Sequence, residues 1–159
     1  MDDIRSPSRD AHNAAHGDAA ASNDAIRGGQ PMTATPTTAP ITLIEAITQA
    51  LAWELEHDPS VLVLGEDVGV NGGVFRATAG LQQTFGAQRV LDTPLDETTI
   101  AGLSVGLAAQ GMKPVAEAQF DGFVYPMVDH LICHAARLRN RTRGRMHCPM
   151  VLRVPWGGG

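Results

Sequence analysis

Four short apolar runs, separated by segments of helical periodicity, most constrain what this chain can fold into. The expected strands are residues 61–65, 89–91, 114–120 and 150–154, and the expected helices are about 42–58, 78–85, 96–110 and 123–140. Strands that alternate with helices join through right-handed crossovers into a parallel sheet. Continuous apolar strand runs are typical of a sheet that is covered on both faces. The pattern therefore predicts an α/β fold, a parallel sheet with flanking helices.

The composition changes sharply near residue 40. Residues 1–40 contain four large apolar residues, Met1, Ile4, Ile26 and Met32, among Ala, Asp, Ser, Thr, Gly and Pro. Such a segment buries too little apolar area to offset its ordering entropy. We expect residues 1–40 to be disordered, with Met32 as a second plausible start, and residues 41–159 to form the domain.

Charge and cysteine content exclude some classes of protein. The 12 Lys and Arg against 17 Asp and Glu give a net charge of −5, which argues against general nucleic-acid binding. Cys133 and Cys148 cannot form a disulfide framework, so a reducing cytoplasm is the expected location. No apolar run reaches about 18 residues, so no membrane span is expected.

Polar residues follow the first three expected strands directly. Ligands of parallel sheets bind beyond the carboxyl ends of the strands, which singles out the loops 65–76, 92–97, 119–123 and 155–159. The polar groups of the first three loops are Glu66 and Asp67, Asp92 to Glu97, and Gln119 to Asp121. The fourth strand is followed by Trp156 to Gly159 and not by a helix. We therefore expect a fragment with an unfinished sheet.

Several stretches in and around these loops carry a family resemblance. They are Leu64-Gly65-Glu66-Asp67-Val68, Gly72-Gly73-Val74-Phe75-Arg76, Arg89-Val90-Leu91-Asp92-Thr93-Pro94-Leu95, Pro114-Val115-Ala116-Glu117-Ala118-Gln119-Phe120 and Arg153-Val154-Pro155-Trp156-Gly157. In combination, residues 41–159 resemble the beta subunit of the thiamine-diphosphate-dependent decarboxylase component of 2-oxo acid dehydrogenase complexes. The resemblance implies a transketolase-like pyrimidine-binding domain, incomplete at its C-terminal end.

By this resemblance, Glu97 is the catalytic residue that hydrogen-bonds a nitrogen of the cofactor's aminopyrimidine ring. A buried carboxyl is pushed toward its neutral form, so it could exchange a proton with the ring and favour the imino tautomer. The imino group then removes the thiazolium proton, and the resulting carbanion attacks a 2-oxo acid. The alternative is a helix N-terminal glutamate that the helix dipole stabilises.

The resemblance assigns four further side chains to the thiamine diphosphate site and none to a metal. Glu66 would lie near the cofactor and relay to Glu97, or else be a solvated loop acid. Leu95 would touch the ring, or else belong to the core. Gln119 and Phe123 would border the aminopyrimidine, Phe123 by stacking, although Phe123 could equally be a core residue that opens a helix.

The sequence lacks a motif for diphosphate and magnesium. In the family that half of the site comes from the alpha subunit, so the implied partners are alpha subunits, two with two beta chains, and the lipoyl acyltransferase core. A catalytic histidine of the family lies beyond residue 159. Where the family usually has Asp-Gln, this chain has Asp129-His130. His130 and His134 share a helix face, but no third metal ligand is in register.

Three functions remain open at this stage. The first is oxidative decarboxylation of pyruvate or a branched-chain 2-oxo acid, with acyl transfer to lipoyl groups. The second is another thiamine-diphosphate enzyme of transketolase type, which would carry the diphosphate motif upstream, where this chain has only residues 1–40. The third is an inactive fragment that only binds a partner chain. The stretch 119–126 resembles branched-chain and bacterial pyruvate types without separating them.

Overall fold

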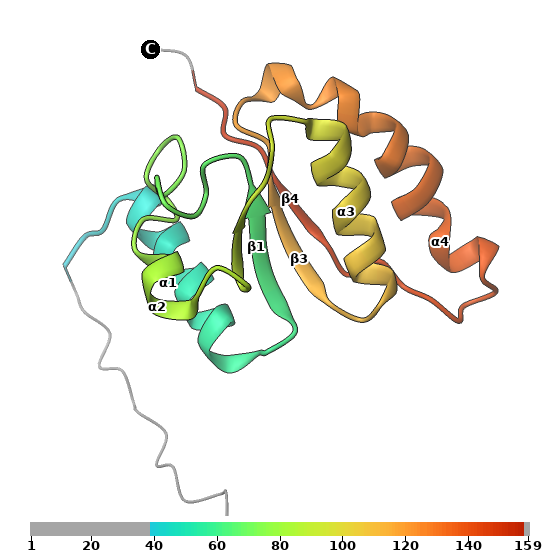
Figure 1. Cartoon of the computed structure of the whole chain (residues 1–159), viewed down its shortest axis with the longest axis horizontal. Helices are drawn as coiled ribbons and strands as arrows, with labels where there is room; N and C mark the ends of the chain where they lie inside the picture. Colours follow the sequence, from blue (N-terminus) through green and yellow to red (C-terminus); the bar gives the residue numbers. More distant parts are fainter. Residues whose placement is uncertain (1–38, 158–159) are drawn as a thin grey trace, which may run out of the picture. The chain divides into compact units, whose positions relative to one another are not determined.

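A computed structural model of the chain describes residues 39–157 and contains one four-stranded sheet (Figure 1). The strands β1 (Val61–Gly65), β2 (Val90–Asp92), β3 (Lys113–Glu117) and β4 (Val151–Arg153) lie in the order β2-β1-β3-β4. All three strand pairs are parallel. The α/β prediction is therefore confirmed. Apart from residues 39 and 40, the segment that was expected to be disordered lies outside the described residues.

Helices cover both faces of the sheet. On one face lie α1 (Leu43–His57) and α2 (Leu81–Phe85), and on the other lie α3 (Glu97–Ala109) and α4 (Ala136–Arg141) (Figure 1). A capping box begins α1: the Glu45 amide donates to Thr42 Oγ1 at 3.2 Å, and the Thr42 amide donates to Glu45 Oε2 at 2.7 Å. Within residues 39–157, no helix combines the length and the hydropathy that a bilayer-spanning segment needs.

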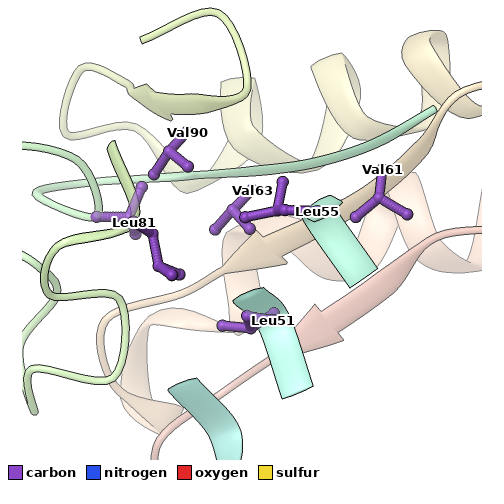
Figure 2. Close-up of a cluster of buried hydrophobic side chains, with 7 residues drawn as sticks. Leu51, Leu55, Val61, Val63, Leu81 and Val90 are labelled. Atoms are coloured by element: carbon purple, nitrogen blue, oxygen red, sulfur yellow. The ribbon is translucent and has the colours of Figure 1, made fainter. Parts of the chain in front are cut away.

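The central strand β1 is buried along its whole length and supplies two hydrophobic clusters. Figure 2 shows the first cluster, in which Val61 and Val63 of β1 join side chains of α1, α2 and β2. Leu62 and Leu64 point to the other face, where they pack with Ile100 of α3. Each fully buried Leu or Val contributes about 1.5–3 kcal/mol. This packing fixes the strands and hence the loops that follow them.

The segment after β3 differs from its prediction. In place of one helix over 123–140, two 3₁₀ turns, Asp121–Phe123 and Tyr125–Met127, precede a π-helical segment, His130–Ala135, that runs into α4. Pro126 lies in the first turn of the second 3₁₀ helix, where its missing N–H leaves no bond unmade. A π-turn has no sequence signature comparable to apolar periodicity, so the prediction missed it.

The third strand is also shorter than the predicted 114–120. Its ladder ends at Glu117, whose register partners are Gly65 of β1 and Arg153 of β4. Both partners are the last residues of their own strands. Pairing stops there because β3 has no neighbour to continue with, and residues 118–120 become part of the loop that carries Gln119.

Candidate functional site

The predicted site residues come together at one edge of the sheet. Glu66 follows β1 directly, Glu97 begins α3 five residues after the end of β2, and Gln119 follows β3 by two residues. Because all strands are parallel, these three positions share the carboxyl edge. In Figure 1 the loops after β1, β2 and β3 lie at the end where the strand arrows point. The predicted location of the three loops is confirmed.

Local hydrogen bonds place Glu97 on the first turn of α3. Asp96 is the N-cap residue: its carboxylate accepts from the Thr98 amide at 3.1 Å and from Thr99 Oγ1 at 2.5 Å. The Asp96 amide in turn donates to the Pro94 carbonyl at 2.9 Å, which tightens the turn before the helix. Glu97 is half-buried, and no hydrogen bond to its carboxyl occurs among the described residues. Its carboxyl is therefore free to meet a ligand.

The carboxyl of Glu66 lies within the electrostatic reach of Glu97. Burial raises the pKa of Glu66, and the negative charges of Asp67 and Glu97 raise it further. A raised pKa means that the Glu66 carboxyl holds its proton to a higher pH than an ordinary glutamate does. A carboxyl in a loop that water surrounds completely would lack the first of these effects. The edge therefore carries two acids, Glu66 and Glu97, and the pKa of Glu66 is raised.

Exposed apolar side chains lie in the loops that follow β2 and β3. Leu95 is 73% exposed and Phe123 is 47% exposed, so neither belongs to the core that the sequence left as an alternative. Phe120 links two other aromatic rings edge to face, with centroid distances of 6.2 Å to Phe75 and 5.9 Å to Phe123. Gln119 precedes this cluster and is half-buried. The edge thus combines carboxyl groups with open apolar surface, which suits a flat heteroaromatic ring.

A buried ion pair beneath this edge was not predicted. Glu117 is 1% exposed and pairs with Arg153, its register partner on the neighbouring strand. Burial lowers the pKa of Arg153. The side chain of Thr78 is also fully buried there, and its hydroxyl has no partner among the described residues. A glutamate inside an apolar strand run was the sequence signal for this pair, because a buried charge needs a partner.

The histidines His130 and His134 lie on the π-helical segment with ring centroids 5.4 Å apart. Among residues 39–157, no group of three or more His, Cys, Asp or Glu side chains is arranged to hold a metal ion. The His130 ring instead packs against α3, where a Cβ on Gly102 would lie 3.1 Å from its Cε1. The structure therefore supports a packing role for His130 on α3.

Residues 39–159 match the family model of the transketolase pyrimidine-binding domain. The chain belongs to that family, and its parallel sheet with flanking helices agrees with the match.

The similar curated proteins are subunits of 2-oxo acid dehydrogenases. The chain is 57% identical over 119 residues to the pyruvate dehydrogenase E1 component subunit beta of Acholeplasma laidlawii, covering 75% of this chain and 36% of that protein. It is 56% identical over 121 residues to the protein of the same description from Bacillus subtilis (strain 168), covering 76% and 37%. A third relative, the 2-oxoisovalerate dehydrogenase subunit beta of Bacillus subtilis, is 53% identical over 116 residues, covering 73% and 36%. The chain thus spans little more than a third of the length of these relatives.

Proposed function

We propose that this chain is the N-terminal, pyrimidine-binding part of a 2-oxo acid dehydrogenase E1 beta subunit and contributes the aminopyrimidine half of a thiamine diphosphate site. The observation that carries the proposal is that Glu66 and Glu97 lie at the same carboxyl edge, where burial and the charges of Asp67 and Glu97 raise the pKa of Glu66. Relatives at 53–57% identity support this function over a transketolase-type enzyme, because their names place them in 2-oxo acid dehydrogenases.

The residues at the edge fit an aminopyrimidine ring in chemistry. A ring nitrogen needs a carboxyl that can share a proton, and Glu97 has a carboxyl that no described group engages. The faces of the ring need apolar contact, and Leu95 and Phe123 are exposed enough to give it. Gln119 can donate to or accept from an amino or ring-nitrogen group. In this proposal Glu97 is the catalytic residue, and Glu66, Leu95, Gln119 and Phe123 bind the cofactor.

Thiamine diphosphate, when bound, supplies the electron sink that decarboxylation of a 2-oxo acid requires. The protein's part is to orient the ring and to hold one proton at the right atom. With the cofactor bound, the Glu97 carboxyl would hydrogen-bond a ring nitrogen and would exchange a proton with it. Glu66 keeps its proton to a higher pH than an ordinary glutamate, since burial and its acidic neighbours raise its pKa.

The diphosphate and its magnesium ion belong to an alpha subunit in this proposal. Two alpha and two beta chains form the enzyme, and a lipoyl acyltransferase core takes over the acyl group. Asp67, an exposed acid in the loop after β1, would repel a diphosphate at this edge, which supports the assignment. We place the enzyme in the cytoplasm. The thiols of Cys133 and Cys148 are both free, as in a reducing compartment.

A chimeric beta subunit tests the proposal. Residues 39–159 replace the matching region of the Bacillus subtilis pyruvate dehydrogenase E1 beta subunit, which is 56% identical there. We expect the chimera to assemble with the Bacillus alpha subunit and to release carbon dioxide from pyruvate or from 3-methyl-2-oxobutanoate. The 159-residue chain mixed with the same alpha subunit is the control for a fragment that only binds. An assembled, folded chimera without decarboxylation of either acid would contradict the proposal.

A further inference from the structure

Asp92 is a carboxylate at the site edge to which the proposed function assigns no role. It is the last residue of β2 and lies opposite Gly65, the last residue of β1, in the parallel register. Its two oxygens bind the loop that follows β1. The Gly69 amide donates to Oδ1 at 2.6 Å, and the Val70 amide donates to Oδ2 at 3.1 Å. One side chain of β2 therefore holds two consecutive amides of the β1 loop.

Glu66 lies inside the loop that Asp92 holds. On its N-terminal side, the Gly65 carbonyl accepts from the Thr93 amide at 3.0 Å, which ties the end of β1 to β2. On its C-terminal side, Asp67 takes the left-handed conformation with φ 58°, and its carbonyl accepts from the Gly73 amide at 2.8 Å. The backbone of the loop reverses direction at Asp67. The hydrogen bond from the Gly69 amide to Asp92 then fixes the loop on the C-terminal side of Glu66.

The absence of a side chain at residue 69 is required for this contact. A Cβ on Gly69 would lie 2.5 Å from Asp92 Oδ2 and would also overlap Nε2 of Gln82. The Gln82 side chain is itself fixed, because Nε2 donates to the Val90 carbonyl at 2.9 Å. Both neighbours of residue 69 are therefore held by β2, and an alanine there would displace the loop rather than them.

The chain also reaches Glu97, the first residue of α3, five residues after Asp92 at the end of β2. Asp92 thus connects the loop that carries Glu66 to the strand end from which the Glu97 turn departs. We propose that Asp92 is a positioning residue, which holds Glu66 beside Glu97 by binding the amides of Gly69 and Val70. A role of Asp92 in catalysis rests on the proposed function. The hydrogen bonds by which Asp92 holds the loop do not depend on it.

Replacing Asp92 by asparagine tests the proposal with little change in size. The amide group of Asn has one acceptor oxygen, so only one of the two loop amides keeps its partner. We expect the Gly69 and Val70 amides to exchange roughly tenfold faster or more, as the loss of a hydrogen bond to a charged acceptor implies. We also expect the pKa of Glu66 to fall toward its ordinary value, because the freed loop lets water reach it and moves it away from Glu97. Carboxyl-carbon NMR of the 159-residue chain measures this titration.

Asp58→Asn is the matched control. Asp58 also binds a loop amide, that of Ser60 at 2.8 Å, but at the opposite edge of the sheet. We expect this variant to lose stability while Glu66 titrates as in the unchanged chain. If Asp92→Asn left the titration of Glu66 unchanged, or if both variants moved it equally, the proposal would be wrong.

Gly69→Ala breaks the same contact without changing a charge. We expect it to shift the Glu66 titration in the same direction as Asp92→Asn. If both variants failed to fold, the contact would hold the whole domain rather than position Glu66, and the proposal would be overturned. All these measurements are made without cofactor. A failure of the proposed function would appear instead in the chimera, so the two can be told apart.

Discussion

Asp58 shows at the scale of a single residue how a carboxylate fixes a sheet edge. It lies at the end of α1, accepts from the Ser60 amide and hydroxyl, and pairs with Lys113 of β3 at 2.7 Å. The Lys113 ammonium and the Ser60 groups hold the pKa of Asp58 well below its usual range. The ionised carboxylate is therefore the form that the folded chain stabilises.

This gives a prediction for the pH dependence of stability. A folded-state pKa below the unfolded value near 3.9 contributes stability that is present above about pH 4 and is lost as the pH falls further. We expect Asp58→Asn to lower the free energy of unfolding at pH 7 and to flatten its decline between pH 4 and pH 2. Urea unfolding at several pH values measures both effects. A variant as acid-sensitive as the original chain would show that Asp58 does not carry this part of the dependence.

The positions of some site residues could be predicted from the sequence, whereas their exposure and long-range contacts could not. The strand ends and the Gly and Pro positions placed Glu66, Glu97 and Gln119 at one edge, because a parallel sheet leaves them no other place. The exposure of Leu95 and Phe123 could not be predicted, since an apolar residue after a strand fits the core equally well. The contact from Asp92 to Gly69 joins residues 23 apart in the chain and depends on loop conformation, for which the sequence has no periodic pattern.

At the scale of elements, the packing of the π-helical segment on α3 distinguishes two glycines of one helix. Gly102 faces the His130 ring, from which an added Cβ would be 3.1 to 3.5 Å away, whereas an added Cβ on Gly106 meets nothing within 4 Å. The two glycines are four residues apart on one helix. The structure assigns the close approach to Gly102 alone, because only one turn of α3 lies under the imidazole.

Alanine at the two positions should therefore have different effects. Gly106→Ala gains helix propensity without a clash, and we expect it to raise the free energy of unfolding of the 159-residue chain by about 0.4–1 kcal/mol. Gly102→Ala has the same gain, but it must push the His130 ring away, so we expect no increase or a loss. Urea denaturation of both variants makes the comparison. Equal stabilisation by both would show that His130 does not pack on α3 as described.

The elements also divide into those that the sequence could predict and those that it could not. The helix expected over about 42–58 is present as α1, because the capping box of Thr42 and the burial of Leu51 and Leu55 favour the same helix. The helix predicted over 123–140 is present from residue 128 to residue 141, but 3₁₀ turns replace its first residues and a π-helical segment lies within it. Its 3₁₀ and π turns change the number of residues per turn without changing the apolar content on which the prediction depended.

At the scale of the whole molecule, the sheet carries only one half of the proposed site. Acids and apolar side chains occupy the edge, which suits a ring and repels an anion. We predict that the 159-residue chain alone binds thiamine diphosphate weakly or not at all, with or without magnesium, and that an alpha subunit is needed for tight binding. Isothermal titration calorimetry measures this. Tight, magnesium-dependent binding by the chain alone would mean that the diphosphate site does not depend on a partner.

The role of Glu97 is the central claim, and it can be measured in the assembled chimera. The most direct measurement is hydrogen–deuterium exchange at the thiazolium carbon of the bound cofactor, followed by quenched-flow NMR. We predict that Glu97→Gln, which keeps the size of the side chain, slows this exchange by roughly 100- to 10,000-fold. Glu66→Gln should slow it less, and Glu45→Gln, in the capping box of α1, should leave it unchanged. Near-normal exchange in a folded and assembled Glu97→Gln enzyme would contradict the account, because Glu97 would then be a first-turn acid stabilised by the helix dipole, without a part in the chemistry.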